Sequence, residues 1–342
     1  MAREPLALVV HGVSHTHARW LLDWSLPDAF RVVALVEPDA GLRDRFARAF
    51  GLSGSSAVPR FADLPPVDAE AVAGFGPVSE HTGVVADAAR AGLAVMLEKP
   101  LATATADAER IAELAARHRV GVFTHYETDA YASLAALAVR LQAGDIGTPL
   151  RITAAHGHPG PVERGVNAEC LAWLADPARD GGAITDFGCY GIAQTLWLLG
   201  GRLPERVTAH GWTRKPERYP GVEDDATLVL DHGDASAAIQ PSWCWPYDRK
   251  ELTVFGPGGS LHARSADELI RRNGDGSRQR LDCPTLPLTR ADPFVRLASF
   301  IRDSAGPAET DPTHLSNAVA TARVLEAARR SAREGRGIRL AL

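Results

Sequence analysis

Short apolar runs alternate with amphipathic stretches along the first third of the chain. Five runs have the nearly continuous apolar character of strands buried on both faces of a sheet. They are Leu6–Val10, Arg31–Val36, Ala69–Gly74, Leu93–Leu97 and Val120–Phe123. Helical spacing covers Ala18–Trp24, Ala40–Phe50, Ser79–Ala91 and Thr105–Arg117. This regular alternation predicts an α/β fold with a doubly wound parallel sheet.

The alternation stops after Tyr126, and the rest of the chain has an α+β pattern. Helices are predicted over Asp129–Gln142 and Asp186–Leu199. The other apolar runs are separated by short turns, as in an antiparallel sheet. They are Leu150–His156, Arg206–Trp212, Ala226–Leu230, Ala235–Trp243 and Glu251–Phe255. A chain of 342 residues can form two cores, and we expect one domain over residues 1–125 and a second over residues 126–342.

Composition excludes several classes of protein. A net charge of −5 and a pI of about 6.2 argue against nucleic-acid binding, which needs a clustered basic face. No apolar run of about 18 residues is present, so we expect no membrane span. The start of the chain lacks the pattern of a signal peptide. Four cysteines without C-x-x-C spacing predict free thiols and a cytoplasmic location.

The turn after the first strand, Gly12-Val13-Ser14-His15, lies where a dinucleotide-binding fingerprint belongs. Only Gly12 remains of the three glycines of G-x-G-x-x-G, with Ser14 and His17 at the other two positions. Glu37 ends the second strand 25 residues later (37 − 12), near the offset at which a carboxylate accepts the ribose hydroxyls of NAD. A carboxylate would repel the 2′-phosphate of NADP, so the pattern favours NAD.

His15-x-His17 also suggests a metal site. At the start of a helix these side chains would diverge by about 200°, and no Asp, Glu or Cys stands beside them in the sequence. We therefore expect no metal site and assign the two histidines a structural or phosphate-facing role.

Lysine is rare in this chain. Of 37 basic residues 34 are arginine, so 37 − 34 leaves Lys99, Lys215 and Lys250. Lys99 stands in Glu98-Lys99-Pro100, at the end of the fifth apolar run. Since lysine can lose its proton when desolvated and arginine cannot, the choice of lysine there suggests chemistry.

The ordered set of motifs resembles the Gfo/Idh/MocA oxidoreductase family. It comprises the Gly12 turn, Glu37, Glu98-Lys99-Pro100, the segment Gly181-Gly182-Ala183-Ile184-Thr185-Asp186-Phe187-Gly188-Cys189-Tyr190, the turn Gly256-Pro257-Gly258-Gly259-Ser260-Leu261, and a C-terminal helix around Leu325-Glu326. The resemblance covers nearly the whole chain. It implies an N-terminal NAD(P)-binding Rossmann domain and a C-terminal α+β domain with a large, mostly antiparallel sheet that forms homodimer or homotetramer contacts.

The resemblance also implies which residues act. Lys99 would lie by the reacting carbon, with Lys99-Pro100 as a cis peptide. Asp186 and Tyr190 stand at i and i+4 on one helical face, and Tyr190 occupies the position that is often His, as in the glucose–fructose oxidoreductase and dihydrodiol dehydrogenase branch. In one scheme Lys99 lowers the pKa of Tyr190, which accepts the substrate proton; in another Lys99 binds the hydroxyl and Asp186 orients it.

The expected binding residues follow from the same reasoning. Cofactor contacts are expected from Gly12, Val13, Ser14, His15, Glu37, Gly76, His81, Glu98, Lys99 and Pro100. Substrate contacts are expected from His125, His156, His158 and Trp173, with Trp243-Cys244-Trp245 as an aromatic platform for a sugar ring.

The function expected from the sequence is NAD-linked hydride transfer at a secondary alcohol of a sugar, inositol or related cyclic polyol. One alternative is an enzyme that recycles NAD through oxidation, elimination of a neighbouring C–O bond and reduction. The other is a non-catalytic regulator that senses the cofactor.

Overall fold

A computed structural model describes residues 4–23, 26–303, 306–309 and 311–340 of the chain. The first sheet has six strands in the order β3-β2-β1-β4-β5-β6, and every pairing in it is parallel. The strands are β1 (Leu6–His11), β2 (Phe30–Val36), β3 (Ala57–Val58), β4 (Ala71–Gly74), β5 (Ala94–Glu98) and β6 (Val122–His125). The five predicted strands are all present, and the doubly wound parallel sheet is confirmed. Strand β3 was not predicted, because two residues carry no pattern.

Three helices of the first part follow the prediction closely, the one-turn helix over Leu26–Ala29 was not predicted, and one predicted helix differs. The unpredicted helix is α2 (Leu26–Ala29), and the three predicted ones are α3 (Ala40–Phe50), α4 (His81–Arg90) and α5 (Thr105–His118). The helix predicted over Ala18–Trp24 is instead a 3₁₀ turn, Thr16–Arg19, followed by the one-turn helix α1 (Trp20–Asp23); Trp24 lies outside the described residues. The segment that follows β1 is therefore short and irregular.

The second sheet has nine strands in the order β14-β13-β12-β11-β7-β10-β9-β8-β15. They are β7 (Arg151–Gly157), β8 (Arg206–Trp212), β9 (Asp225–Asp231), β10 (Ser236–Ser242), β11 (Arg249–Gly256), β12 (Gly259–Ala263), β13 (Leu269–Asn273), β14 (Arg278–Leu281) and β15 (Ile338–Arg339). All neighbours are antiparallel except β7 and β10. A large, mostly antiparallel sheet is thus confirmed.

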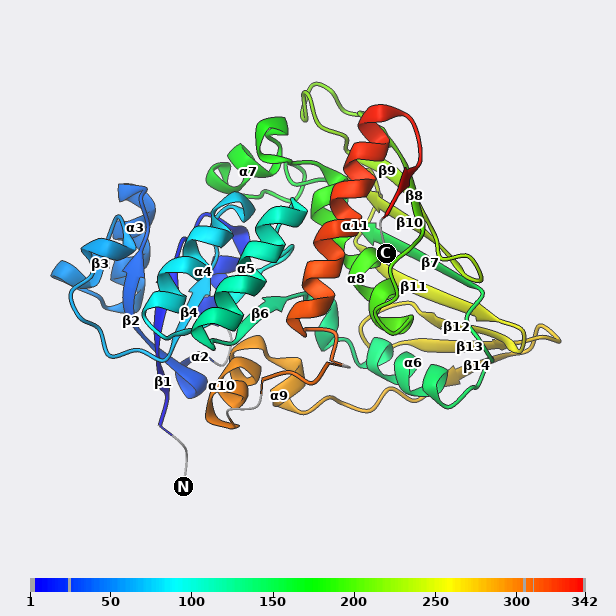
Figure 1. The fold of residues 1–342 in the computed structure, drawn as a ribbon, viewed down its shortest axis with the longest axis horizontal. Coiled ribbons are helices and arrows are strands. Elements are labelled where there is room, and N and C mark those ends of the chain that lie inside the picture. The colour runs from blue at the N-terminus through cyan, green and yellow to red at the C-terminus, as the bar shows by residue number, and fades with distance from the viewer. Residues whose placement is uncertain (1–3, 24–25, 304–305, 310, 341–342) are drawn as a thin grey trace.

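The helices of the second half lie either on one face of this sheet or beside the first part of the chain (Figure 1). They are α6 (Ala132–Gln142), α7 (Ala168–Leu174), α8 (Cys189–Leu198), α9 (Leu288–Ala291), α10 (Pro293–Asp303) and α11 (Leu315–Glu334). Helix α11 packs on α8 and β8 and also on α5, so it contacts both halves. Helix α10 returns to the first sheet, where Phe294 and Leu297 join the core beside Phe30 and Phe75. Within the described residues no helix is long and apolar enough to cross a membrane.

Candidate active site

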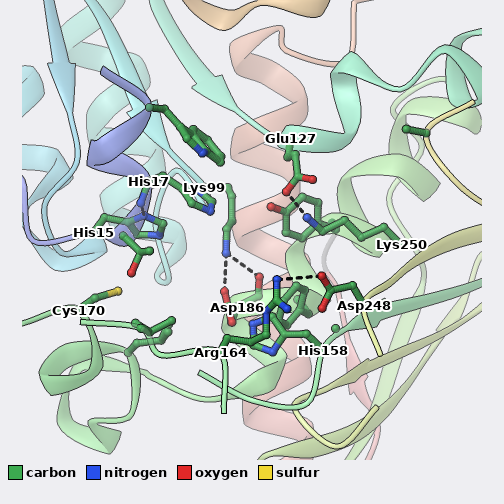
Figure 2. Close-up of a pocket in the computed structure, with 18 of the residues that line it drawn as sticks. His15, His17, Lys99, Glu127, His158, Arg164, Cys170, Asp186, Asp248 and Lys250 are labelled. Carbon is green, nitrogen blue, oxygen red and sulfur yellow. Dashed lines mark hydrogen bonds and ion pairs between the residues drawn. The ribbon is translucent and has the colours of Figure 1, made fainter. Parts of the chain in front are cut away.

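A pocket of about 450 Å³ opens between the two sheets, at the carboxyl ends of the parallel strands (Figure 2). This is where ligands bind in doubly wound folds. One wall comes from the turn after β1 and from Lys99 at the end of β5. The opposite wall comes from the end of β7, the turn before α8 and the start of β11. Both halves of the chain therefore build the pocket.

Lys99 and Asp186 form the centre of the pocket. Lys99 Nζ donates to Asp186 Oδ1 at 2.5 Å and to the Asp186 backbone oxygen at 2.9 Å (Figure 2). Both side chains are buried. The Lys99-Pro100 peptide is cis, as the family resemblance implied. The pair unites residues that are 87 positions apart in the sequence.

Asp186 is presented by an irregular turn. Ile184–Gly188 is a π-helix that leads directly into α8, and such turns often occur at functional sites. The turn is held from outside, because Ile184 N donates to Glu223 Oε1 at 2.9 Å. Trp243 Nε1 donates to Asp186 Oδ2 at 2.9 Å, so both carboxylate oxygens have a donor. The predicted aromatic platform is therefore corrected: Trp243 is fully buried and supports Asp186.

Charge pairing fixes the protonation of these two groups. Burial opposes the charged form of Lys99, but the neighbouring Asp186 carboxylate more than compensates and raises the Lys99 pKa above its ordinary value. Burial likewise opposes ionisation of Asp186, but Lys99 outweighs it and lowers the Asp186 pKa to about 2. At neutral pH the pocket thus contains an ammonium and a carboxylate.

Tyr190 differs from one expectation. Burial, followed by the charge of Glu127, raises the Tyr190 pKa well above its ordinary value, so the prediction of a phenolate stabilised by Lys99 is wrong. The ring lies 5.3 Å from Lys99 Nζ and 5.3 Å from Lys250 Nζ, within the range of cation–π contact. Tyr190 therefore lies on the pocket wall as a neutral phenol between two ammonium groups.

The second of these ammonium groups belongs to a charge pair that the sequence analysis missed. Lys250 Nζ pairs with Glu127, whose other carboxylate oxygen accepts from the Tyr131 hydroxyl at 3.0 Å (Figure 2). Arg164 and Asp248 form a further pair on the pocket rim at 3.1 Å. The rarity of lysine was the only sequence signal for Lys250, since Glu127 lies 123 residues away.

The turn after β1 adopts the conformation that a dinucleotide site needs. Gly12 has a φ of +73°, and a Cβ there would lie 2.8 Å from the Gly76 Cα, so two glycines bring the ends of β1 and β4 together. The strand order reverses between β1 and β4, which makes this crevice the topological switch point. Gly12 and Gly76 therefore fit the expected cofactor site.

Glu37 ends β2 beside this turn. Its carboxylate accepts from Val13 N at 2.8 Å and from Asp39 N at 2.9 Å. A carboxylate has about four acceptor positions, so two remain for ribose hydroxyls. Burial raises the Glu37 pKa, and the two hydrogen bonds from the Val13 and Asp39 amide groups act against that shift.

Ser14 makes contacts that the sequence did not predict. Trp173 Nε1 donates to Ser14 Oγ at 3.2 Å, and Asn167 Nδ2 donates to the Ser14 backbone oxygen at 3.1 Å. Thr16 Oγ1 donates to Asn167 Oδ1 at 2.9 Å. The second half of the chain therefore lies directly against the turn after β1, and Trp173 contacts this turn rather than the substrate pocket.

Glu98 supplies the strongest fit to a cofactor. Its side chain is 2% exposed, and neither carboxylate oxygen has a hydrogen-bond donor among the described residues. A buried carboxylate without donors is costly, and hydroxyl or amide groups of a bound dinucleotide would satisfy it. His81 lies nearby with Nδ1 at 3.0 Å from the Leu101 oxygen and Nε2 without a partner. When bound, NAD supplies the hydride chemistry; Gly12 to His15 and Glu37 would hold its adenosine and phosphate part, and Gly76, His81 and Glu98 to Pro100 its nicotinamide part.

The expected substrate residues divide into two groups. His158 lines the pocket beside Phe187. His156 is fully buried behind Tyr190, because strand alternation directs it into the core, and His125 is buried next to Trp20. Neither His125, His156 nor Trp173 reaches the pocket surface, so these three expectations are corrected.

The expectation that no metal binds stays a prediction, but one of its premises is corrected. His15 caps the 3₁₀ turn with extended backbone angles (φ −66°, ψ 138°), so the helical divergence assumed for His15 and His17 does not apply. Their rings lie 4.4 Å apart, and Glu98 approaches from β5 to complete a group of three potential ligands.

Comparison with known proteins agrees with this architecture. Residues 6–126 match the oxidoreductase family with an NAD-binding Rossmann fold, and residues 134–262 match the GFO/IDH/MocA C-terminal domain. The chain is 28% identical over 276 residues to dTDP-3,4-didehydro-2,6-dideoxy-alpha-D-glucose 3-reductase of Streptomyces antibioticus, over 80% of this chain and 79% of that protein.

A second curated relative covers a similar span. The chain is 28% identical over 319 residues to trans-1,2-dihydrobenzene-1,2-diol dehydrogenase of Oryctolagus cuniculus, over 81% of this chain and 91% of the relative. Among solved structures, an inositol dehydrogenase homologue from Azotobacter vinelandii complexed with NAD⁺ has the same fold, with a TM-score of 0.83 at 21% identity over 99% of this chain and 98% of that one. The first domain is thus an NAD-binding Rossmann domain, and the chain belongs to the Gfo/Idh/MocA family of oxidoreductases.

Proposed function

We propose that this enzyme transfers hydride between NAD and a secondary alcohol, or the corresponding ketone, of a sugar, inositol or related cyclic polyol. The observation that carries the proposal is the buried Lys99–Asp186 pair, which faces a polar pocket at the cofactor end of the first sheet. A sensor of the cofactor would need no such proton-handling pair.

Lys99 is the group that acts on the reacting oxygen. As an ammonium it donates a hydrogen bond to that oxygen and supplies the proton when a ketone is reduced. Asp186 fixes the direction of Nζ through a charged hydrogen bond, and Trp243 fixes Asp186. This arrangement corresponds to the scheme in which Lys99 binds the hydroxyl and Asp186 orients it. Tyr190 positions the lysine through its ring.

The remaining pocket wall suits a ligand with several hydroxyl groups. The Lys250–Glu127 and Arg164–Asp248 pairs and His158 present donors and acceptors side by side (Figure 2). Each pair of opposite charges offers a ligand both a hydrogen-bond donor and an acceptor, and the two charges largely cancel. The curated relatives named above are named for a dTDP-linked didehydro-dideoxyglucose and for a dihydrobenzene diol, whose reacting parts are a ketone and an alcohol on a six-membered ring.

Turnover with a panel of polyols, sugars and cyclic diols, with NAD and NADP in parallel, tests the proposal. We expect NADH to form with at least one compound, and Lys99→Met to lower kcat/KM at least about 100-fold. His118→Gln, an exposed change at the end of α5, should retain full activity. An enzyme with unimpaired turnover after Lys99→Met would contradict the assignment. Product release without net NADH would indicate the recycling reaction instead.

We also propose that the enzyme is a homodimer or homotetramer that assembles through the nine-stranded sheet. In β8 and β9 buried residues alternate with exposed ones, so one face of the sheet packs on helices and the other is open. Val229 and Phe255 are exposed apolar residues on the open face. Light scattering should give a dimer or larger, and Val229→Asp with Phe255→Asp should shift the mass towards a monomer.

A cytoplasmic location completes the proposal. All four cysteines, Cys170, Cys189, Cys244 and Cys283, are free thiols, which suits a reducing compartment. Cell fractionation tests this location.

A further inference from the structure

The His15-x-His17 motif takes no part in the proton transfer proposed above, although His15 belongs to the turn that would hold the cofactor and both histidines line the pocket (Figure 2). We propose that His15, His17 and Glu98 form a binding site for a divalent transition-metal ion of the Zn²⁺ class. The three residues come from the turn after β1 and from the end of β5, which the parallel pairing of the first sheet brings to one edge.

The distances suit a common ion. One potential ligand atom from each residue lies within 4.8 Å of the other two. His17 Nδ1 and Glu98 Oε1 are 3.2 Å apart, the separation of two ligands that each lie about 2.1 Å from one ion.

Three polar atoms of this group lack hydrogen-bond partners among the described residues. His17 Nδ1 and both Glu98 oxygens are buried, and none of them has a hydrogen-bond partner among the described residues. His17 Nδ1 and Glu98 Oε1 approach to 3.2 Å without the geometry of a hydrogen bond. A buried carboxylate in this state is stabilised by a cation, and an ion would satisfy it together with His17.

The ligand set selects the class of ion. Imidazole nitrogens prefer Zn²⁺ and neighbouring transition metals, whereas Mg²⁺ and Ca²⁺ prefer oxygen ligands. Two histidines and one carboxylate also form the protein ligands of many catalytic zinc sites, where one position is left for water or substrate.

Two features moderate the affinity. His15 Nδ1 accepts from His17 N at 3.0 Å, so an ion bound at His15 must replace this hydrogen bond or turn the ring. The Lys99 ammonium stands next in the chain to Glu98, although its charge is compensated by Asp186. We therefore expect a site that exchanges its ion, with weaker binding than a preformed structural zinc site.

Metal binding is measured on the full-length chain without a polyhistidine tag, after removal of metals by a chelator and in the absence of NAD. The probes are Co²⁺, followed by its visible absorption, and Zn²⁺, followed by calorimetry. We expect one Co²⁺ per chain, displaced by Zn²⁺. Glu98→Gln and His17→Gln should each weaken binding at least about tenfold, and the exposed control His118→Gln should leave it unchanged.

Two variants keep the test independent of folding. His17 is partly exposed, so His17→Gln should fold even if Glu98→Gln in the buried position does not, and circular dichroism checks both. A wild-type Kd for Zn²⁺ above about 1 mM would overturn the proposal. Unchanged affinity in a folded His17→Gln variant would also overturn it, because the ion would then be bound elsewhere. Neither result bears on the hydride-transfer proposal, which is tested by turnover and Lys99→Met.

Discussion

The buried ion pair of Lys99 and Asp186 is held in place by hydrogen bonds from and to neighbouring groups. Each charge is buried, and a buried charge is tolerated only when a partner and hydrogen bonds replace water. Lys99 has two acceptors on one residue, and Asp186 has donors on both oxygens. The pair is thus positioned before any substrate arrives, which is the condition for efficient proton transfer.

We expect Lys99→Arg to lower kcat/KM at least about 100-fold while the protein remains folded. The substitution keeps the positive charge, but a planar guanidinium cannot place its donors where the compact ammonium contacts Asp186. Lys215→Arg is the matched control, because Lys215 lies outside the pocket and pairs with Glu163. Steady-state kinetics with a substrate found in the panel provide the measurement. Equal losses in both variants would show that arginine at any lysine position disturbs the fold.

Trp243 acts through Asp186, so its removal should change a pH profile. The Nε1–H donor contributes to the low pKa of Asp186, and Trp243→Phe removes that donor. The Asp186 pKa then rises, and the acidic limb of the profile of kcat/KM should move to higher pH by about one unit.

The control for this variant is Tyr219→Phe. The rings of Tyr219 and Trp243 pack at a tilt with their centroids 4.9 Å apart, and the Tyr219 hydroxyl donates to Glu163 rather than to Asp186. The acidic limb of the kcat/KM profile of Tyr219→Phe should stay at the pH of the wild type. A Trp243→Phe profile with an unchanged limb would limit Trp243 to a packing role.

At the scale of single elements, the π-turn Ile184–Gly188 determines where Asp186 points. Gly182 precedes it with a φ of +117°, and a Cβ at this position would lie 2.4 Å from Glu223 Oε1. Since Glu223 Oε1 accepts from Ile184 N, the glycine and the glutamate together hold the start of the turn.

Gly182→Ala should therefore destabilise the protein by about 1–3 kcal/mol and reduce turnover through the displaced turn. Gly83→Ala is a control of opposite sign, because Gly83 lies on α4 with open space around it. That change should stabilise the protein by about 0.5–1 kcal/mol. Denaturant midpoints and kcat for both variants give the comparison, and a fully stable Gly182→Ala would show that Glu223 can move aside freely.

The sequence predicted best those helices and strands whose ends are determined by residues next to them in the chain. Helix α3 begins and ends as predicted, because Asp39 caps its first turn and Gly51 ends it in the left-handed region. Strands β13 and β14 were missed, because each contains two arginines and lacks the apolar pattern of a buried strand. Both strands lie at one edge of the sheet.

The same division holds for the site. Glu98, Lys99 and Asp186 could be predicted because motifs mark them. Glu127 could not, since it pairs with Lys250, 123 positions away, and such a contact leaves no local pattern. Trp243 was named for another role, because its bond to Asp186, 57 positions away, leaves no local pattern either. The relative directions of the His15 and His17 side chains were misjudged, because His15 is a cap residue and was treated as helical.

At the scale of the molecule, the seam between the two halves contains a buried carboxyl group with a shifted pKa. Asp129 lies in the turn after β6 and faces Arg296 of α10, together with Arg290 and Asp311. Burial raises its pKa to about 7, with the arginines acting against the shift and Asp311 adding to it. The native protein therefore holds a proton at Asp129 over a pH range in which the unfolded chain has lost it.

This shift predicts a pH-dependent stability. Because the folded pKa lies above the unfolded value of about 3.9, the free energy of unfolding should fall as the pH rises from about 4 to 7. Asp129→Asn removes the ionisation, so the variant should exceed the wild type by at least about 1 kcal/mol at pH 8 and lose this advantage near pH 4. Urea unfolding at several pH values measures the difference, and an equal effect at all pH values would assign it to packing.

The scarcity of lysine has a practical consequence for handling the enzyme. All three lysine ammonium groups are in ion pairs, and their side chains are 6%, 20% and 18% exposed. Reagents that acylate amines attack the free, unprotonated form, so these three side chains should react slowly. Mild acylation should therefore couple a dye or a solid support mainly to the α-amino group, whose ordinary pKa is near 8. Harsher acylation should reach the pocket and inactivate the enzyme, and a bound substrate should protect it.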